Sequence, residues 1–281
     1  MMLTDAIRAE GYRLLKNRTT VFWSVVFLPV MSLVLSTLGV LAARLNEKQL
    51  AEANINLNMP GGALDLGQTL LAVAADVANP AVLLFVLIGA ATVYAGDYRW
   101  ETWRLTSARN SRPALLLAKV VNVALLALAA IAVLVLSKVI GDAIKGVIMG
   151  RSLSFSLGDD AGRMLAVGGL GWARIVQFTL IGLLTAVVSR SLLAALFVPL
   201  VVGVAQAAAP MILAGMGVTP GGWVSMLVSP AQAFDLLKSD LAGEIVPLVA
   251  LTPAVTSFVL WLILPLAGAL AWFSRQDLSK E

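Results

Sequence analysis

Long apolar runs separated by short polar segments dominate the pattern of this 281-residue sequence. A helix needs about 20 residues to cross a hydrocarbon core of about 30 Å. Six runs are long enough and predict spanning helices, near residues 20–42, 79–96, 114–137, 166–189, 191–214 and 250–273. These runs do not alternate between apolar and polar residues, as the strands of a membrane β-barrel do. The pattern predicts an all-α fold with six transmembrane helices, forming a single transmembrane domain over residues 1–281.

The N-terminal residues predict an amphipathic helix that lies on the membrane surface. Apolar residues recur there at helical spacing on one face: Leu3, Ala6, Ile7, Leu14 and Leu15. The charged residues Asp5, Arg8, Arg13 and Lys16 fall largely elsewhere. A simpler role, a basic anchor for the first spanning helix, fits the same residues and is compatible with it.

The segment 215–249 contains apolar stretches too short to cross a bilayer. They are interrupted at Pro220, Gly221, Pro230 and Asp235. Irregular backbone is tolerated at membrane depth where protein buries it. We therefore expect short re-entrant or interfacial helices before the last span.

Composition agrees with the membrane class, since 59% of the residues are hydrophobic and 13% are charged, against about 25% charged in soluble domains. Residues 1–19, 97–119, 190 and 274–281 together hold twelve Lys or Arg and six Asp or Glu. Loops rich in Lys and Arg stay in the cytoplasm. This bias predicts a multi-pass membrane protein with both termini cytoplasmic and residues 44–78, 138–165 and 215–249 outside.

Missing residue types exclude several kinds of chemistry. The chain has no Cys and no His, which removes thiol nucleophiles, Ser/His/Asp triads and the usual zinc sites. It contains no GxxxxGK[ST] motif for binding nucleotide phosphates. We expect no enzymatic activity, metal site or cofactor in this chain. The basic residues are dispersed over membrane-flanking loops, so no nucleic-acid partner is expected.

The acidic residues also bear on transport. Every Asp and Glu lies outside the six runs, whereas transporters driven by proton or cation gradients place carboxylates inside their helices. If the chain moves a substrate, we expect the energy to come from another subunit.

Residues 96–119, GDYRWETWRLTSARNSRPALLLAK, concentrate charge and aromatic surface between two apolar runs. A helix near 97–112 would place Trp100 and Trp103 on one side and let Glu101 pair with Arg104. One interpretation is an interfacial helix whose tryptophans lie among the lipid headgroups. The other is a coupling helix that docks in a groove of a partner through aromatic anchors ringed by charges.

The coupling interpretation assigns roles along this segment. Trp100, Glu101, Trp103 and Arg104 would contact the partner. Of the residues that follow, Arg109 and Arg112 would hold the helix to the inner leaflet, and Pro113 would start the third span.

Arg174 and Gln177 are polar residues inside the fourth apolar run. Arg174 could extend to the outer headgroups, with Trp172 as an interfacial anchor. Alternatively, Arg174 and Gln177 could mark the translocation path or a dimer interface. Asn122 and Gln206 are expected to form hydrogen bonds between helices.

Several of these features together resemble the membrane subunit of an ABC type-2 exporter: the basic amphipathic N-terminus, six spans, the charged loop ending in SRPALLLAK, and the broken outer segment before the last span. Two positions depart from the family pattern. Glu101 stands where the family has Gly before Thr, and Ala108, Arg109 and Asn110 precede the Ser-Arg pair where the family has Pro.

The resemblance implies a complex of two six-span subunits with two cytoplasmic ABC ATPases. This chain would then pair with a second copy of itself or with a paralogous permease, and its coupling helix would lie in the 97–112 loop. The substrate stays open. So does a second class, a polytopic membrane protein that acts without a motor, such as a channel, scaffold or immunity factor.

Overall fold

The computed structural model describes residues 3–46, 63–99 and 111–276. Six helices in this part of the chain are long and apolar enough to cross a membrane. The first spans Arg18–Leu45 and consists of α2 (Arg18–Val21), a π-helical turn η1 (Phe22–Val26) and α3 (Phe27–Leu45). The others are α6 (Pro80–Arg99), α8 (Arg112–Met149), α9 (Ala161–Ser189), α10 (Leu192–Gly215) and α13 (Leu248–Arg275). The chain is therefore an all-α, multi-pass membrane protein, as predicted.

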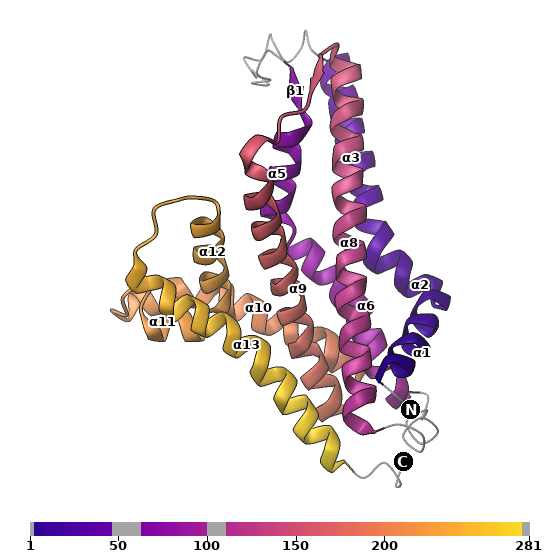
Figure 1. Cartoon of the computed structure of the whole chain (residues 1–281), viewed down its shortest axis with the longest axis vertical. Coiled ribbons are helices and arrows are strands. Elements are labelled where there is room, and N and C mark those ends of the chain that lie inside the picture. The colour runs from indigo at the N-terminus through magenta and orange to yellow at the C-terminus, as the bar shows by residue number, and fades with distance from the viewer. Residues whose placement is uncertain (1–2, 47–62, 100–110, 277–281) are drawn as a thin grey trace.

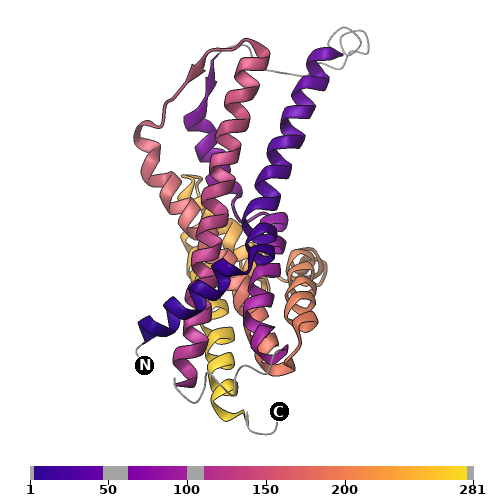
Figure 2. The ribbon, with the colours of Figure 1, turned by 90° about the vertical axis from the view of Figure 1, so that its right-hand side faces the viewer.

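The helices form an elongated bundle (Figure 1). The N-terminal helix α1 (Leu3–Lys16) and the C-terminal end of α13 lie at the same end, which is the lower end in Figures 1 and 2. The same end holds the last turn of α6 and the first turn of α8. The last turn of α6 and the first turn of α8 therefore lie at the same end of the bundle as α1 and the end of α13.

The helix α8 is longer than the sequence predicted. Its 38 residues extend about 57 Å at 1.5 Å per residue, nearly twice the thickness of a hydrocarbon core. The predicted span stopped at residue 137, before the polar residues Lys138, Asp142 and Lys145. These continue the helix, because Lys145 pairs with Asp142 at 2.8 Å one turn away, until Gly150 ends it in a left-handed conformation.

The limits of α6 and α8 also correct the placement of the acids. Asp97 belongs to the last turn of α6, and Asp142 lies inside α8. The sequence ranges had left every acid outside the spans. The helices are longer than the predicted ranges, and two of them therefore contain an acidic residue.

Short elements cover the end of the bundle opposite α1. Strand β1 (Leu64–Asp65) pairs in parallel with β2 (Leu153–Ser154). Helix α5 (Leu66–Asp76) and the 3-10 turn η2 (Gly158–Asp160) follow them, within segments predicted only as outer loops. The Asp65 carboxylate accepts hydrogen bonds from the Ser156 hydroxyl, from Ser156 N at 3.0 Å and from Gly67 N at 2.8 Å. These contacts lower its pKa, chiefly through the Ser156 hydroxyl.

Two short helices precede α13, as the interrupted apolar pattern predicted. They are α11 (Trp223–Val228) and α12 (Pro230–Leu241). The Ser229 hydroxyl between them donates to the carbonyl of Gln206 at 2.8 Å, and Ser257 on α13 donates to the carbonyl of Met226 at 2.6 Å. These bonds hold the interrupted segment against the long helices.

Helix α9 occupies the centre of the bundle and packs against α6, α10 and α13. Its side chains Ile175, Leu183 and Val187 are fully buried. In contrast, α3 and α10 expose much of their apolar surface, including Leu35 and Val204. These two helices offer the broadest apolar faces to lipid or to another subunit.

Candidate functional site

The residues assigned to partner contact, Trp100, Glu101, Trp103 and Arg104, lie in the segment 100–110, outside the described residues. Arg109 lies there too, so the predicted helix near 97–112 stays a prediction. The structure does describe both edges of the segment. Residues 97–99 complete α6, and Pro113 stands in the first turn of α8, as predicted.

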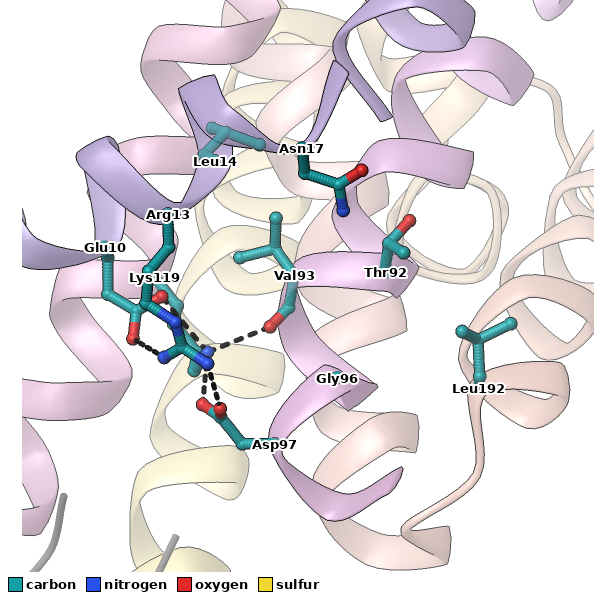
Figure 3. A pocket seen from close by; sticks show the side chains of 10 residues that line it. All are labelled: Glu10, Arg13, Leu14, Asn17, Thr92, Val93, Gly96, Asp97, Lys119 and Leu192. Carbon is teal, nitrogen blue, oxygen red and sulfur yellow. Dashed lines mark hydrogen bonds and ion pairs between the residues drawn. The ribbon is translucent and has the colours of Figure 1, made fainter. Parts of the chain in front are cut away.

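Four charged side chains from three helices meet at these edges and form a closed ring of ion pairs, here called the ion ring: Glu10 and Arg13 of α1, Asp97 of α6 and Lys119 of α8 (Figure 3). Arg13 contacts Glu10 at 2.9 Å and Asp97 at 2.7 Å. Lys119 contacts Asp97 at 2.6 Å and Glu10 at 3.3 Å. Each acid therefore touches both bases.

Two of the four side chains in the ion ring are almost completely buried, and one is half-exposed. The Asp97 and Lys119 side chains are each 2% exposed, whereas Arg13 is 46% exposed. Lys119 also donates to the carbonyl of Val93 at 3.0 Å. Burying a charge without a partner is costly, and two acids against two bases leave no net charge in the ring.

The electrostatics of Arg13 follow from this geometry. Its burial alone would lower the pKa of the guanidinium. Hydrogen bonding and charge from Asp97, and then from Glu10, outweigh the burial and raise the pKa of Arg13 above its usual value. The two acids of the ring therefore hold the Arg13 guanidinium in its charged form.

Helix α1 reaches α8 closely enough to form the ring because Gly11 has no side chain. A Cβ at Gly11 would lie 2.8 Å from Oδ1 of Asn122 on α8. The amide of Asn122 donates to the carbonyl of Ile7 on α1 at 3.0 Å, which confirms the hydrogen bond between helices expected of Asn122. The buried face of α1 contains Ala6 and Glu10, while Leu15 is exposed.

A second polar cluster, here called the Gln276 cluster, ties the same edges to α13 and α9. It consists of Tyr98, Arg112 and Gln276. The Tyr98 hydroxyl donates to Oε1 of Gln276 at 3.1 Å, and the Gln276 amide donates to the carbonyl of Val187 at 2.5 Å. Arg112 donates to the carbonyls of Ser274 and Gln276 at 3.0 and 2.6 Å.

The position of Arg112 differs from its predicted role as a contact to the inner leaflet. Its guanidinium is engaged by the end of α13, whose last carbonyls have no partners within the helix. Arg112 therefore joins the start of α8 to the end of α13.

A cavity of about 210 Å³ lies beside the ion ring (Figure 3). The ring residues line it together with Leu14, Asn17, Thr92, Gly96 and Leu192. Its walls thus come from α1, α6, α8, α10 and the Asn17 turn.

Arg174 and Gln177 form a separate polar site inside the bundle. Arg174 is 4% exposed, and Gln177 is fully buried. The Arg174 guanidinium donates to Oε1 of Gln177 and, at 2.9 Å, to Oε1 of Gln206 on α10. Gln177 donates to the carbonyl of Phe258 on α13 at 2.9 Å.

These contacts show that the lipid-facing interpretation of Arg174 is wrong, because its charged group is turned toward α10. Trp172, expected as an interfacial anchor, donates instead to the carbonyl of Ala124 on α8 at 2.9 Å. Gln206 makes the bond between helices that was predicted for it.

The sequence interpretation missed Glu10 and Lys119. Lys119 carried a usable signal, since it lies inside the predicted run 114–137, and a charge within a spanning helix needs a partner. Nothing in the pattern of Glu10 marks it as that partner, because the two residues are 109 positions apart.

Residues 3–46, 63–99 and 111–276 contain no group of three or more acidic, His or Cys side chains that could hold a metal ion. Comparison with family models, with curated proteins and with solved structures gives no match to this chain.

Proposed function

We propose that the chain is the permease subunit of an ATP-driven ABC type-2 exporter. It forms half of the translocation pathway and receives force from a separate ATPase through the segment 100–110. One observation carries this proposal: the residues on both sides of that segment are tied by buried and partly buried polar contacts to α1, α9 and α13.

The mechanical reason is that a displacement must pass from the segment into the spanning helices without being lost. Asp97 and Lys119 connect the two edges directly and hold α1 against them. Tyr98 and Arg112 connect the same edges to the end of α13. A push on the segment would therefore move α1, α6, α8 and α13 together.

The burial of these contacts matters for stiffness. An exposed ion pair contributes about 0–1 kcal/mol and opens readily. Breaking a buried pair by removing one partner costs about 3–5 kcal/mol. Asp97 and Lys119 are each 2% exposed, so their ion pair is a buried one and the larger cost applies to it.

The partners follow from the same proposal. Two ABC ATPase subunits dock on Trp100, Glu101, Trp103 and Arg104 of two permeases, the second being another copy or a paralogue. The exposed apolar faces of α3 and α10 supply surface for that pairing and for the bilayer. The excess of Lys and Arg on one set of loops supports cytoplasmic termini in a bacterial inner membrane.

Arg174 and Gln177 belong to the translocation path in this proposal. Their support is a buried cation with two neutral amide partners, Gln177 and Gln206, in the middle of the bundle. Arg174→Ala is expected to impair transport while the protein is expressed normally.

The test is purification of the tagged chain from its native membranes in mild detergent. We expect an ATPase with a nucleotide-binding motif to co-purify, and Glu101→Ala with Trp103→Ala to release it. The matched control is Trp272→Ala, which removes an exposed tryptophan from the last turn of α13. Helix α13 finishes at the same end of the bundle as α6 (Figure 1). A chain that transports in liposomes without ATP, and whose double variant behaves as the unmodified protein, would establish the motor-independent alternative.

A further inference from the structure

A second cavity, of about 370 Å³, lies at the side of the bundle between α9, α10, α12 and the start of α6. Most of its walls are apolar and include Leu83, Phe178, Leu200, Val204 and Phe234. Its size falls within the range of about 300–1,000 Å³ that is usual for small-molecule sites.

The cavity reaches the surface of α10. Val204, one of its lining residues, is 71% exposed, and Ala207 one turn further on is exposed as well. Because α10 is one of the six candidate membrane-spanning helices, this opening faces the bilayer or a neighbouring subunit. Gly203 keeps α10 close to α9 here, since a Cβ at Gly203 would lie 3.1 Å from the Phe178 ring.

Two charged residues line the otherwise apolar cavity. Arg174 is buried and, among the described residues, no carboxylate lies within ion-pair distance of its guanidinium. A guanidinium has five N–H donors, and the two bonds described for Arg174 go to neutral amides. A buried charge is normally paired; Arg174 has no direct ion pair among the described residues, and the charge of Asp235 acts on it only from a greater distance.

The side-chain amide of Gln206, which contacts Arg174, has an unused hydrogen-bond donor. Gln206 accepts from Arg174 through Oε1, which fixes the orientation of its amide. Its Nε2 is buried and has no hydrogen-bond partner. One buried amide donor next to Arg174 therefore lacks an acceptor.

Asp235 on α12 supplies the opposite charge on another wall of the cavity. Its carboxylate is 68% exposed and its ion pair with Lys238 is long, at 4.0 Å. Asp235 is thus available to a ligand cation, at a distance from Arg174 greater than that of a direct ion pair.

We propose that this cavity binds a zwitterionic amphiphile, namely a phospholipid whose headgroup carries a phosphate and an ammonium. The phosphate accepts hydrogen bonds from Arg174, and the ammonium pairs with Asp235. The acyl chains leave past Val204 along the apolar face of α10. This binding does not depend on an ATPase, so it stands or falls separately from the proposed function.

The experiment uses the full chain, purified and delipidated in detergent, and an acyl-labelled fluorescent phosphatidylethanolamine whose anisotropy reports binding. Unlabelled phosphatidylethanolamine is expected to displace the probe. Phosphatidylglycerol lacks the ammonium, diacylglycerol lacks both charges, and soluble phosphoethanolamine lacks the chains. Each is expected to displace the probe at least tenfold less effectively.

Variants locate the site. Arg174→Gln and Asp235→Asn are each expected to weaken binding of the probe at least tenfold. Arg163→Gln on α9 and Asp240→Asn on α12 remove charges of the same helices that do not line the cavity, and should leave binding unchanged.

A second pair of variants avoids the buried arginine. Ala207→Phe fills the opening on α10, while Ala208→Phe adds the same ring at the next exposed position, which does not line the cavity. Only Ala207→Phe should weaken binding. Equal displacement by all four competitors, or unchanged binding to both the Ala207→Phe and Asp235→Asn variants, would overturn the proposal.

Discussion

Lys119 is the residue whose removal tests the ion ring most sharply. Its ammonium contacts both acids, Asp97 at 2.6 Å and Glu10 at 3.3 Å. Lys119→Met keeps the length of the side chain and removes the charge. Removing one member of a buried pair costs about 3–5 kcal/mol, and the lower end applies because Arg13 still contacts both acids.

The loss should appear first at α1, which the ring holds against α6 and α8. At about 1.4 kcal/mol per decade, a loss of about 3 kcal/mol raises the population of detached α1 roughly 100-fold. Hydrogen–deuterium exchange of the α1 amides, followed by mass spectrometry in nanodiscs, measures this directly. Lys138→Met, which removes an exposed lysine of the same helix, should leave the exchange of α1 unchanged.

The double variant Lys119→Met with Asp97→Leu completes the cycle. Replacing both partners of a buried ion pair by apolar residues is often close to neutral. The double variant should therefore lose less protection in α1 than the sum of the single variants. Unchanged exchange of α1 in Lys119→Met, or strictly additive losses, would refute the view that the ring attaches α1 to the bundle.

Three further expectations concern other parts of the chain. Hydrogen bonds from Ser156 lower the pKa of Asp65. Their stabilising effect is therefore present above the usual Asp pKa of about 3.9 and is lost as the pH falls through the lowered pKa. Ser156→Ala should move the carbon-13 NMR titration of the Asp65 carboxyl to higher pH. An added Cβ at Gly171 would lie 2.3 Å from Val77, so Gly171→Ala should destabilise the protein by about 1–3 kcal/mol and lower its melting temperature, whereas Gly169→Ala, with open space around it, should not. In intact cells an impermeant maleimide should label single cysteines placed at three predicted outer positions, Glu52, Asp160 and Asp240. It should not label a cysteine at the predicted cytoplasmic position Arg104.

The six spans could be predicted because the length and polarity of an apolar run are local properties of the sequence. The start of α8 was equally local, since Pro113 suits the first turn of a helix. The far end of α8 was missed because polar residues were taken as the end of the span. Asp142 and Lys145 instead continue the helix beyond the thickness of the hydrocarbon core.

The contacts of the candidate site depend on how the helices pack, and the sequence pattern does not contain that information. Glu10 and Lys119 belong to different helices and are 109 positions apart in the sequence. The contact of Arg174 with Gln206, 32 positions away, excludes the lipid-facing interpretation, and the place of Arg174 on a translocation path stays a proposal. A charge inside an apolar run could be noticed from the sequence, but its partner could not be chosen.

The central claim is that the segment 100–110 docks on an ABC ATPase, and crosslinking from within the segment tests it most directly. Trp103 is replaced in living cells by the photoreactive benzoyl-phenylalanine, and the membranes are irradiated and searched for adducts by mass spectrometry. Replacement of Trp223, an exposed tryptophan of α11, serves as the control. We predict an adduct with an ATPase that carries a nucleotide-binding motif from position 103 and none from position 223. Adducts from position 103 with lipid alone, in cells that express the protein at its normal level, would contradict the claim.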